Sequence, residues 1–141
     1  MEYGDFLEQM NEREVFVFLK ILAQLAGSDG VLQQEEKEFI QMVAKTHGVQ
    51  EQKVQDLLLP EDEAAVIAMA SEIKDRKVAL QIIKEMCLLA HSDDNLTEKE
   101  TMFIGKVATA MGVELEKVAQ ISQWVIDRII WLEEAKVIFE E

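Results

Sequence analysis

Two stretches of the chain share one pattern, and this pattern decides the fold. Residues 25–40 read LAGSDGVLQQEEKEFI, and residues 89–104 read LAHSDDNLTEKETMFI. A shift of 64 residues lays 19–58 over 83–122 without a gap, and 15 of these 40 positions are identical. Self-similarity at a fixed spacing is typical of a repeated structural unit. We therefore predict an internal duplication, with copies at about residues 16–58 and 80–122.

Each copy has the pattern of a helix, an acidic turn, a second helix, a glycine stop and a further helix. The 141 residues include one proline and six glycines, so few positions interrupt helices. The sequence therefore predicts an all-α fold: one compact domain over residues 1–141, a bundle of about seven to eight helices with an internal pseudo-two-fold repeat. A linker helix at about 61–73 is expected to join the copies, and a C-terminal helix to cover about 114–139.

Several helix ends have local causes in the sequence. Thr97 and Glu100 have the spacing of a capping box, in which each side chain binds the backbone N–H of the other residue. Gly48 and Gly112 stand where a left-handed residue closes a helix. Asp75 is expected to cap the helix that opens the second copy.

The charge balance excludes some classes of partner. With 14 basic and 28 acidic side chains the formal net charge is −14, which disfavours nucleic acid and anionic membranes as ligands. Hydrophobic residues make up 49% of the chain, which is a globular composition. The chain opens Met1-Glu2-Tyr3-Gly4-Asp5, has a single cysteine and has no apolar run of membrane-spanning length, so we expect a cytoplasmic protein without membrane insertion.

The two acidic turns are the candidate metal site. If the turns converge, Asp29, Glu36, Asp93, Asp94 and Glu100 supply hard oxygen ligands that suit calcium, magnesium or manganese. Neither turn is a self-contained EF-hand loop, because the places of its first two carboxylate ligands hold other residue types. In the alternative reading, these acidic residues only cap helices and accept hydrogen bonds from turn amides.

Cys87 and His91 lie one helical turn apart, and with Asp93 or Asp94 they offer a small zinc or nickel site. The alternative is that Cys87 is a small buried apolar residue, because it aligns with Ala23 in the repeat. No catalytic constellation is recognised, since the adjacent residues His91, Ser92 and Asp93 cannot form a hydrolase triad. We therefore expect a protein that is not an enzyme.

The C-terminal helix is apolar on more than one face, which is typical of a helix covered on several sides. One interpretation is that it runs through the middle of the domain and supplies core. The other is that Trp124 or Trp131 anchors a homodimer or a partner interface, where tryptophan is over-represented.

The motif that runs from Ala26 to Ile40, and again from Ala90 to Ile104, resembles the TerB-like domain of tellurite resistance. The superfamily also includes the N-terminal domain of the DjlA-type membrane co-chaperone. The resemblance covers residues 16–131 and implies an acidic, all-helical domain linked to bacterial stress response and to divalent-metal binding. The second motif departs from the pattern by having Asp94-Asn95 in place of Gly-x.

Two functions are therefore expected as alternatives. The first is a TerB-like stress-response domain of the tellurite or metal tolerance type, which binds protein partners and a divalent cation. The second is a protein-interaction or co-chaperone-like module without a metal role.

Overall fold

The chain folds into helices throughout its described part. The computed structural model describes residues 10–27, 34–46, 48–59, 61–91 and 97–140. These residues form seven α-helices and no strand, which confirms the predicted all-α class. The helices are α2 (Glu12–Ala26), α3 (Gln34–Thr46), α4 (Glu51–Leu58), α5 (Glu63–Ala70), α6 (Arg76–His91), α7 (Glu98–Ala110) and α8 (Leu115–Phe139).

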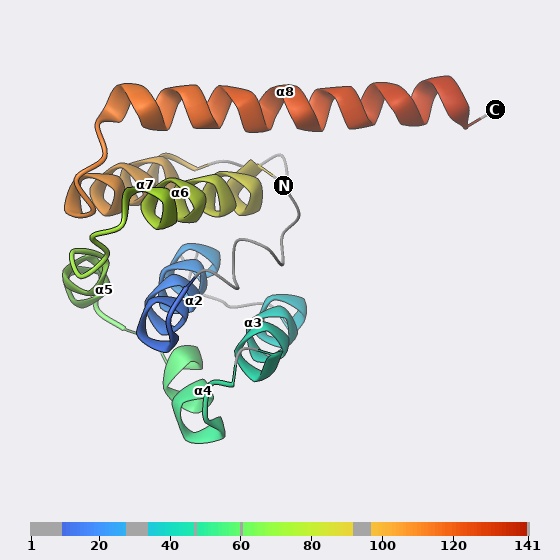
Figure 1. Cartoon of the computed structure of the whole chain (residues 1–141). Helices are drawn as coiled ribbons and strands as arrows, with labels where there is room; N and C mark the ends of the chain where they lie inside the picture. Colours follow the sequence, from blue (N-terminus) through green and yellow to red (C-terminus); the bar gives the residue numbers. More distant parts are fainter. Residues whose placement is uncertain (1–9, 28–33, 47, 60, 92–96, 141) are drawn as a thin grey trace.

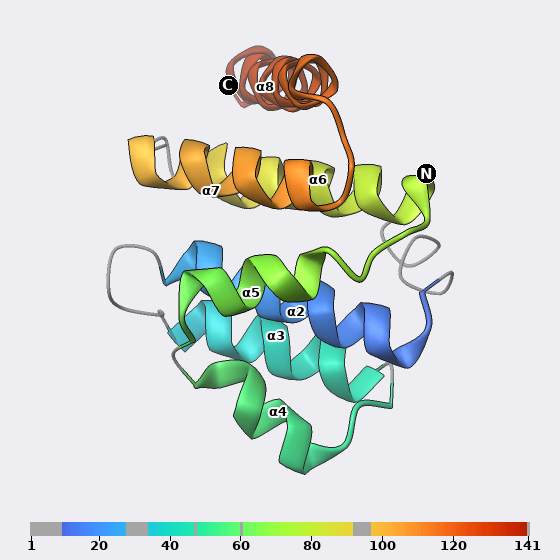
Figure 2. The same cartoon turned by 90° about the vertical axis from the view of Figure 1, so that its left-hand side faces the viewer.

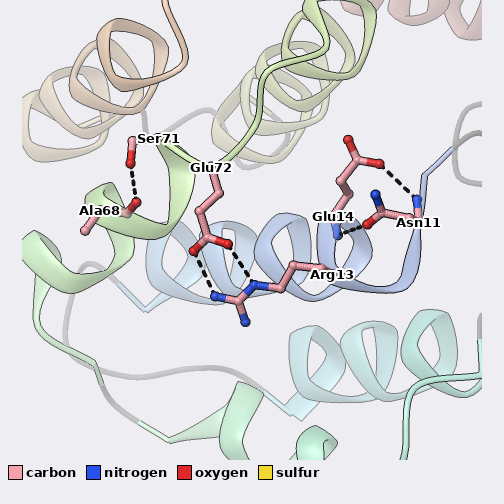
Figure 3. A network of polar contacts seen from close by, with 6 residues as sticks. All are labelled: Asn11, Arg13, Glu14, Ala68, Ser71 and Glu72. Carbon is pink, nitrogen blue, oxygen red and sulfur yellow. Dashed lines mark hydrogen bonds and ion pairs between the residues drawn. The ribbon is translucent and has the colours of Figure 1, made fainter.

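Side-chain caps open three of these helices. The predicted capping box of α7 is confirmed: Thr97 Oγ1 accepts from the Glu100 N–H at 3.1 Å, and Glu100 Oε1 accepts from the Thr97 N–H at 3.2 Å. Asp75 Oδ1 accepts from the Lys77 N–H at 2.8 Å at the start of α6, as predicted. A second capping box, between Asn11 and Glu14, opens α2 (Figure 3).

Glycines in the left-handed region close α3 and α7. Gly48 has a φ of 74° and Gly112 a φ of 78°, which confirms the predicted stops. In both places the valine after the glycine donates its N–H to a carbonyl five residues back, from Val49 to Ala44 and from Val113 to Ala108, each at 2.9 Å. This is the Schellman closure, in which a residue with a Cβ would be strained at the glycine position.

The helices are stacked in levels with α2 at the centre of the lower part. α2 contacts α3, α4, α5 and α6, while α7 contacts α5, α6 and α8. Figures 1 and 2 show α8 above α6 and α7, which in turn lie above α2 and α5. The largest fully buried side chains come mainly from α2 and α6: Phe18, Leu19, Ile21, Leu25, Ile82, Ile83 and Met86. The core therefore lies along the contact between these two helices.

Polar contacts connect α2 to the turn after α5 and to the end of α4. The Arg13 guanidinium of α2 binds both carboxylate oxygens of Glu72, at 2.8 and 2.9 Å, in the turn after α5 (Figure 3). Lys20 of α2 is only 3% exposed, and its ammonium donates to the carbonyl oxygens of Asp56 at 2.6 Å and Leu59 at 3.2 Å. The lysine thus binds the carbonyl end of α4, where the helix dipole favours a positive charge.

The two halves of the chain have the same pattern of neighbours. α2 contacts α3 and α4, which contact each other, and α6 contacts α7 and α8, which also contact each other. The internal repeat and its pseudo-two-fold symmetry stay predictions from the sequence. The helix between the halves, α5, spans Glu63–Ala70 and is shorter than the expected 61–73.

The interpretation of the C-terminal helix as a central core helix is wrong. Of the 25 described residues of α8, Val125 alone is buried, and Figure 2 shows the helix outside the rest of the bundle. The reason is that α6 and α7 cover one face of α8, so the apolar residues on its other faces stay exposed.

Candidate interaction surface

One face of α8 anchors the helix to the bundle. Val125 is fully buried, and Val118, Ile121 and Ile129 pack partly buried against the core. Spacings of three and four residues place these four side chains on one side of a helix. The anchored part therefore lies in the first half of α8, which Figure 1 shows over α6 and α7.

Polar side chains fix the rotation of α8 on α6. His91 Nε2 and Ser122 Oγ lie 3.0 Å apart, and Ser122 lowers the pKa of the Cys87 thiol, against the larger effect of burial. At the beginning of α8, Arg76 Nη2 donates to Glu114 Oε1 at 2.6 Å. Because these contacts hold the anchored face, they also determine which residues of α8 face away from the bundle.

Large apolar side chains of α8 are exposed in two rows. Trp124, Trp131 and Ile138 are spaced by seven residues, so they lie along one line beside the anchored face. Leu132 and Phe139 follow Val125 by seven and fourteen residues, so they continue the line of the anchored face and are exposed where α8 extends beyond α6 and α7 (Figure 1). These five residues are here named the α8 stripe. The exposed fractions are 54% for Trp124, 67% for Trp131 and 81% for Phe139.

A polar strip lies beside the α8 stripe. Glu116, Gln123, Asp127 and Glu134 are all exposed, and spacings of seven and four residues place them near one line of the helix. Gln123 Nε2 donates to Asp127 Oδ1 at 3.0 Å within this strip. The helix therefore presents two chemically different surfaces to solvent, which allows matched variants to be placed on the same element.

The helices hold little of the net charge. α8 has four acidic and three basic side chains, so its formal charge is −1, while α2 and α7 are balanced and α6 has +2. Most of the net charge of −14 therefore belongs to residues outside the helices. Aromatic residues and arginine, both present on α8, are enriched at the centres of protein interfaces.

A buried carboxyl group lies near α8. Glu85 of α6 is 6% exposed, and its Oε1 is 3.4 Å from the Lys84 ammonium. Burial raises the pKa of the Glu85 carboxyl, and the positive charges of Lys84 and of Arg128 on α8 oppose this rise. No local pattern in the sequence predicts this buried carboxyl group, because its burial depends on contacts between separate helices.

The structure describes only two of the five residues of the candidate metal site, Glu36 and Glu100. Asp29, Asp93 and Asp94 lie outside the described residues. Glu100 lies in the capping box of α7, where its carboxylate binds Thr97, and Glu36 lies in the first turn of α3. Within the described ranges, no group of three or more His, Cys, Asp or Glu side chains is arranged to hold a metal ion. The capping role of Glu100 is therefore the one that the geometry supports.

Cys87 and His91 face the contact between α6 and α8. Cys87 is buried, as the apolar interpretation predicted, and burial raises the pKa of its thiol to about 11. A thiol with this pKa stays protonated at neutral pH, whereas a nucleophilic cysteine reacts as the thiolate. The geometry supports a role for both residues in fixing α8.

The hollow beside the beginning of α8 is apolar. It lies between α5, α7 and Leu115, has a volume of about 700 Å³ and is lined by Ala64, Ile67, Met102, Gly105, Lys106, Thr109, Ala110 and Leu115. Its one ionisable side chain, Lys106, pairs with Glu63 at 3.3 Å. The hollow thus continues the apolar character of α8 onto α5 and α7.

Comparisons of the chain with protein-family models, with curated proteins and with solved structures found no match. In the described part of the chain, no helix is both long enough and apolar enough to cross a bilayer.

Proposed function

We propose that this chain is a non-enzymatic, TerB-like interaction domain that binds a protein partner through the α8 stripe. The observation that supports this proposal is the exposure of Trp124, Trp131 and Phe139 on a helix that Val125 anchors to the bundle. Monomeric proteins rarely leave a contiguous apolar patch of this kind open unless it binds something.

The chemistry of the stripe favours a protein as the partner. Tryptophan supplies a large apolar area with only two side-chain torsions to order, and it dominates the energetics of many protein interfaces. Nucleic acid is disfavoured because the chain has twice as many acidic as basic side chains. The cytoplasmic stress-response setting and a divalent cation at the acidic turns rest on the two motifs and on their resemblance to the TerB-like family.

Site-specific photo-crosslinking tests the proposed surface. The photoreactive residue benzoylphenylalanine is placed at Trp131 in the full chain, in living cells, and the crosslinked products are identified by mass spectrometry. Its bulk and aromatic character are close to those of tryptophan, so the stripe is preserved. We expect discrete protein adducts at this position, because a bound partner lies within reach of the stripe.

The matched control places the same photoreactive residue at Gln123, which is exposed on the polar strip of the same helix. We expect few or no adducts there. Equal adducts from Gln123 and Trp131, or none from either, would contradict a binding surface at the α8 stripe. Circular dichroism of both purified variants confirms that helix content is unchanged.

A further inference from the structure

The α8 stripe is a surface that a second copy of the chain can cover. We infer that two copies pair through α8 in an antiparallel arrangement, with the two-fold axis at Trp131. This inference rests on the proposed function, because it names the occupant of the same surface.

The first argument is the position of the charges. α8 contributes −1 to the net charge of −14 and the two glutamates after it contribute −2, so residues 1–114 of each copy have −11. A parallel pair of α8 helices would bring these two acidic bodies side by side. In an antiparallel pair the bodies lie at opposite ends, because the first half of α8 is anchored to its own bundle and the second half extends beyond α6 and α7 (Figure 1). Repulsion between like charges falls with distance and is screened by salt.

The second argument is the match of side chains in one register. A two-fold axis at Trp131 places this residue opposite its own copy and Trp124 opposite Ile138 of the other copy. This register therefore brings the exposed apolar side chains of the two copies together at the centre of the contact.

The third argument is the available area. With about 150–250 Å² for a whole aromatic side chain, the exposed parts of Trp124, Trp131 and Phe139 amount to roughly 400 Å² per copy. A specific interface buries about 800 Å² per partner. The three aromatic side chains supply about half of this area, and Leu132, Ile138 and the stems of the flanking charged residues can supply the rest.

Sedimentation velocity of the purified full chain over a range of concentrations tests the pairing. We expect a reversible dimer of twice 16.1 kDa. Trp131→Glu is expected to raise the dissociation constant by about a thousandfold, because it removes a central tryptophan twice per dimer. Gln123→Glu, on the polar strip, is the matched control and is expected to leave the dimer in place.

Crosslinking in a Cys87→Ala background tests the register. A mixture of Asp127→Cys and Ala135→Cys chains is expected to form mixed dimers with a short bis-maleimide, and Asp127→Cys chains alone are not.

Each contrary result overturns the inference in a different way. A monomer at all concentrations, or a dimer that Trp131→Glu leaves intact, overturns pairing through the stripe. Crosslinking of Asp127→Cys with itself overturns the antiparallel register. If the chain is monomeric but photo-crosslinks at Trp131 to another protein, the proposed function stands and the second copy is excluded.

Discussion

Lys20→Met is expected to destabilise the fold substantially, although it replaces a charged residue by an apolar one inside the bundle. The Lys20 ammonium donates to the carbonyl oxygens of Asp56 and Leu59 and lies 3.3 Å from Glu61 Oε2. Methionine preserves the length and apolar stem of the side chain but removes all three polar contacts. The carbonyl oxygens at the end of α4 are backbone groups that the substitution cannot remove.

The magnitude follows from these contacts. A buried hydrogen-bonding group that loses its partner costs about 1–3 kcal/mol. Asp56 O is partly compensated because it also accepts from the Leu59 N–H at 3.3 Å. The cost of burying an ammonium is relieved in the variant, which offsets part of the loss. We therefore expect a loss of about 2 kcal/mol in the free energy of unfolding, or roughly 6–10 °C in Tm for a chain of this size.

Urea unfolding followed by circular dichroism measures this loss, with an unchanged m-value as the sign that the same transition is compared. The matched control is Lys53→Met on α4, where the side chain is 51% exposed and pairs with Glu12 at 3.5 Å. This surface pair is expected to contribute at most about 1 kcal/mol. A midpoint for Lys20→Met that is no lower than that of the control would refute the role assigned to Lys20.

Three further predictions concern local features. Gly112→Ala is expected to lower the free energy of unfolding by about 1–2 kcal/mol in urea unfolding, because the residue has a φ of 78°; Ala110→Gly, in the last turn of α7, is the control for the intrinsic preference of the residue type. The pKa of Glu85 is raised above 4.5 in the folded state, so the folded state binds more protons than the unfolded state. The contribution of Glu85 to the free energy of unfolding therefore falls as pH rises from 4.5 through the raised pKa. The free energy of unfolding of Glu85→Gln, measured from pH 5 to pH 8, should therefore fall less with pH than that of the unchanged chain. Parallel pH profiles for the two proteins would contradict a raised pKa of Glu85. Cys87, with a thiol pKa of about 11 and almost no exposure, is expected to react with a thiol reagent at pH 8 far more slowly in the folded chain than in urea, and equal rates would contradict its burial.

Local signals explain most of what could be predicted about the fold. The capping box at Thr97, the cap at Asp75 and the glycine at 112 each depend on residues within a few positions of one another. The capping box of Asn11 and Glu14 has the same three-residue spacing and was missed, although its signal is equally local. Helix ends are predictable in this way because caps satisfy backbone groups that every helix leaves unpaired.

Contacts between distant segments explain what could not be predicted. Lys20 is buried because its partners are carbonyl groups 36 and 39 residues further along the chain, and no sequence pattern reports that distance. For the metal site the difficulty is similar: a carboxylate such as Glu100 fits a helix cap and a cation site equally well in sequence. Only the position of its neighbours distinguishes the two.

The C-terminal helix shows a third kind of limit. The apolar residues around α8 indicate that several faces are covered, but a sequence does not say whether the cover comes from the same chain or from another molecule. The structure places α6 and α7 on one face, which leaves Trp131 and Phe139 exposed. The same pattern that suggested a core helix is therefore equally consistent with a helix that completes its burial in a complex.

Hydroxyl-radical footprinting of the tryptophans over a range of protein concentrations tests the central claim most directly. In a dilute sample, we expect rapid oxidation of Trp131, because the structure leaves two thirds of its surface open. In a concentrated sample, we expect protection of Trp131 to rise with the fraction of dimer seen in sedimentation, while an exposed residue of another helix, Met42 of α3, keeps its rate. Strong protection of Trp131 even in the most dilute sample would contradict an exposed stripe, and a rate independent of concentration would contradict its burial by a second copy.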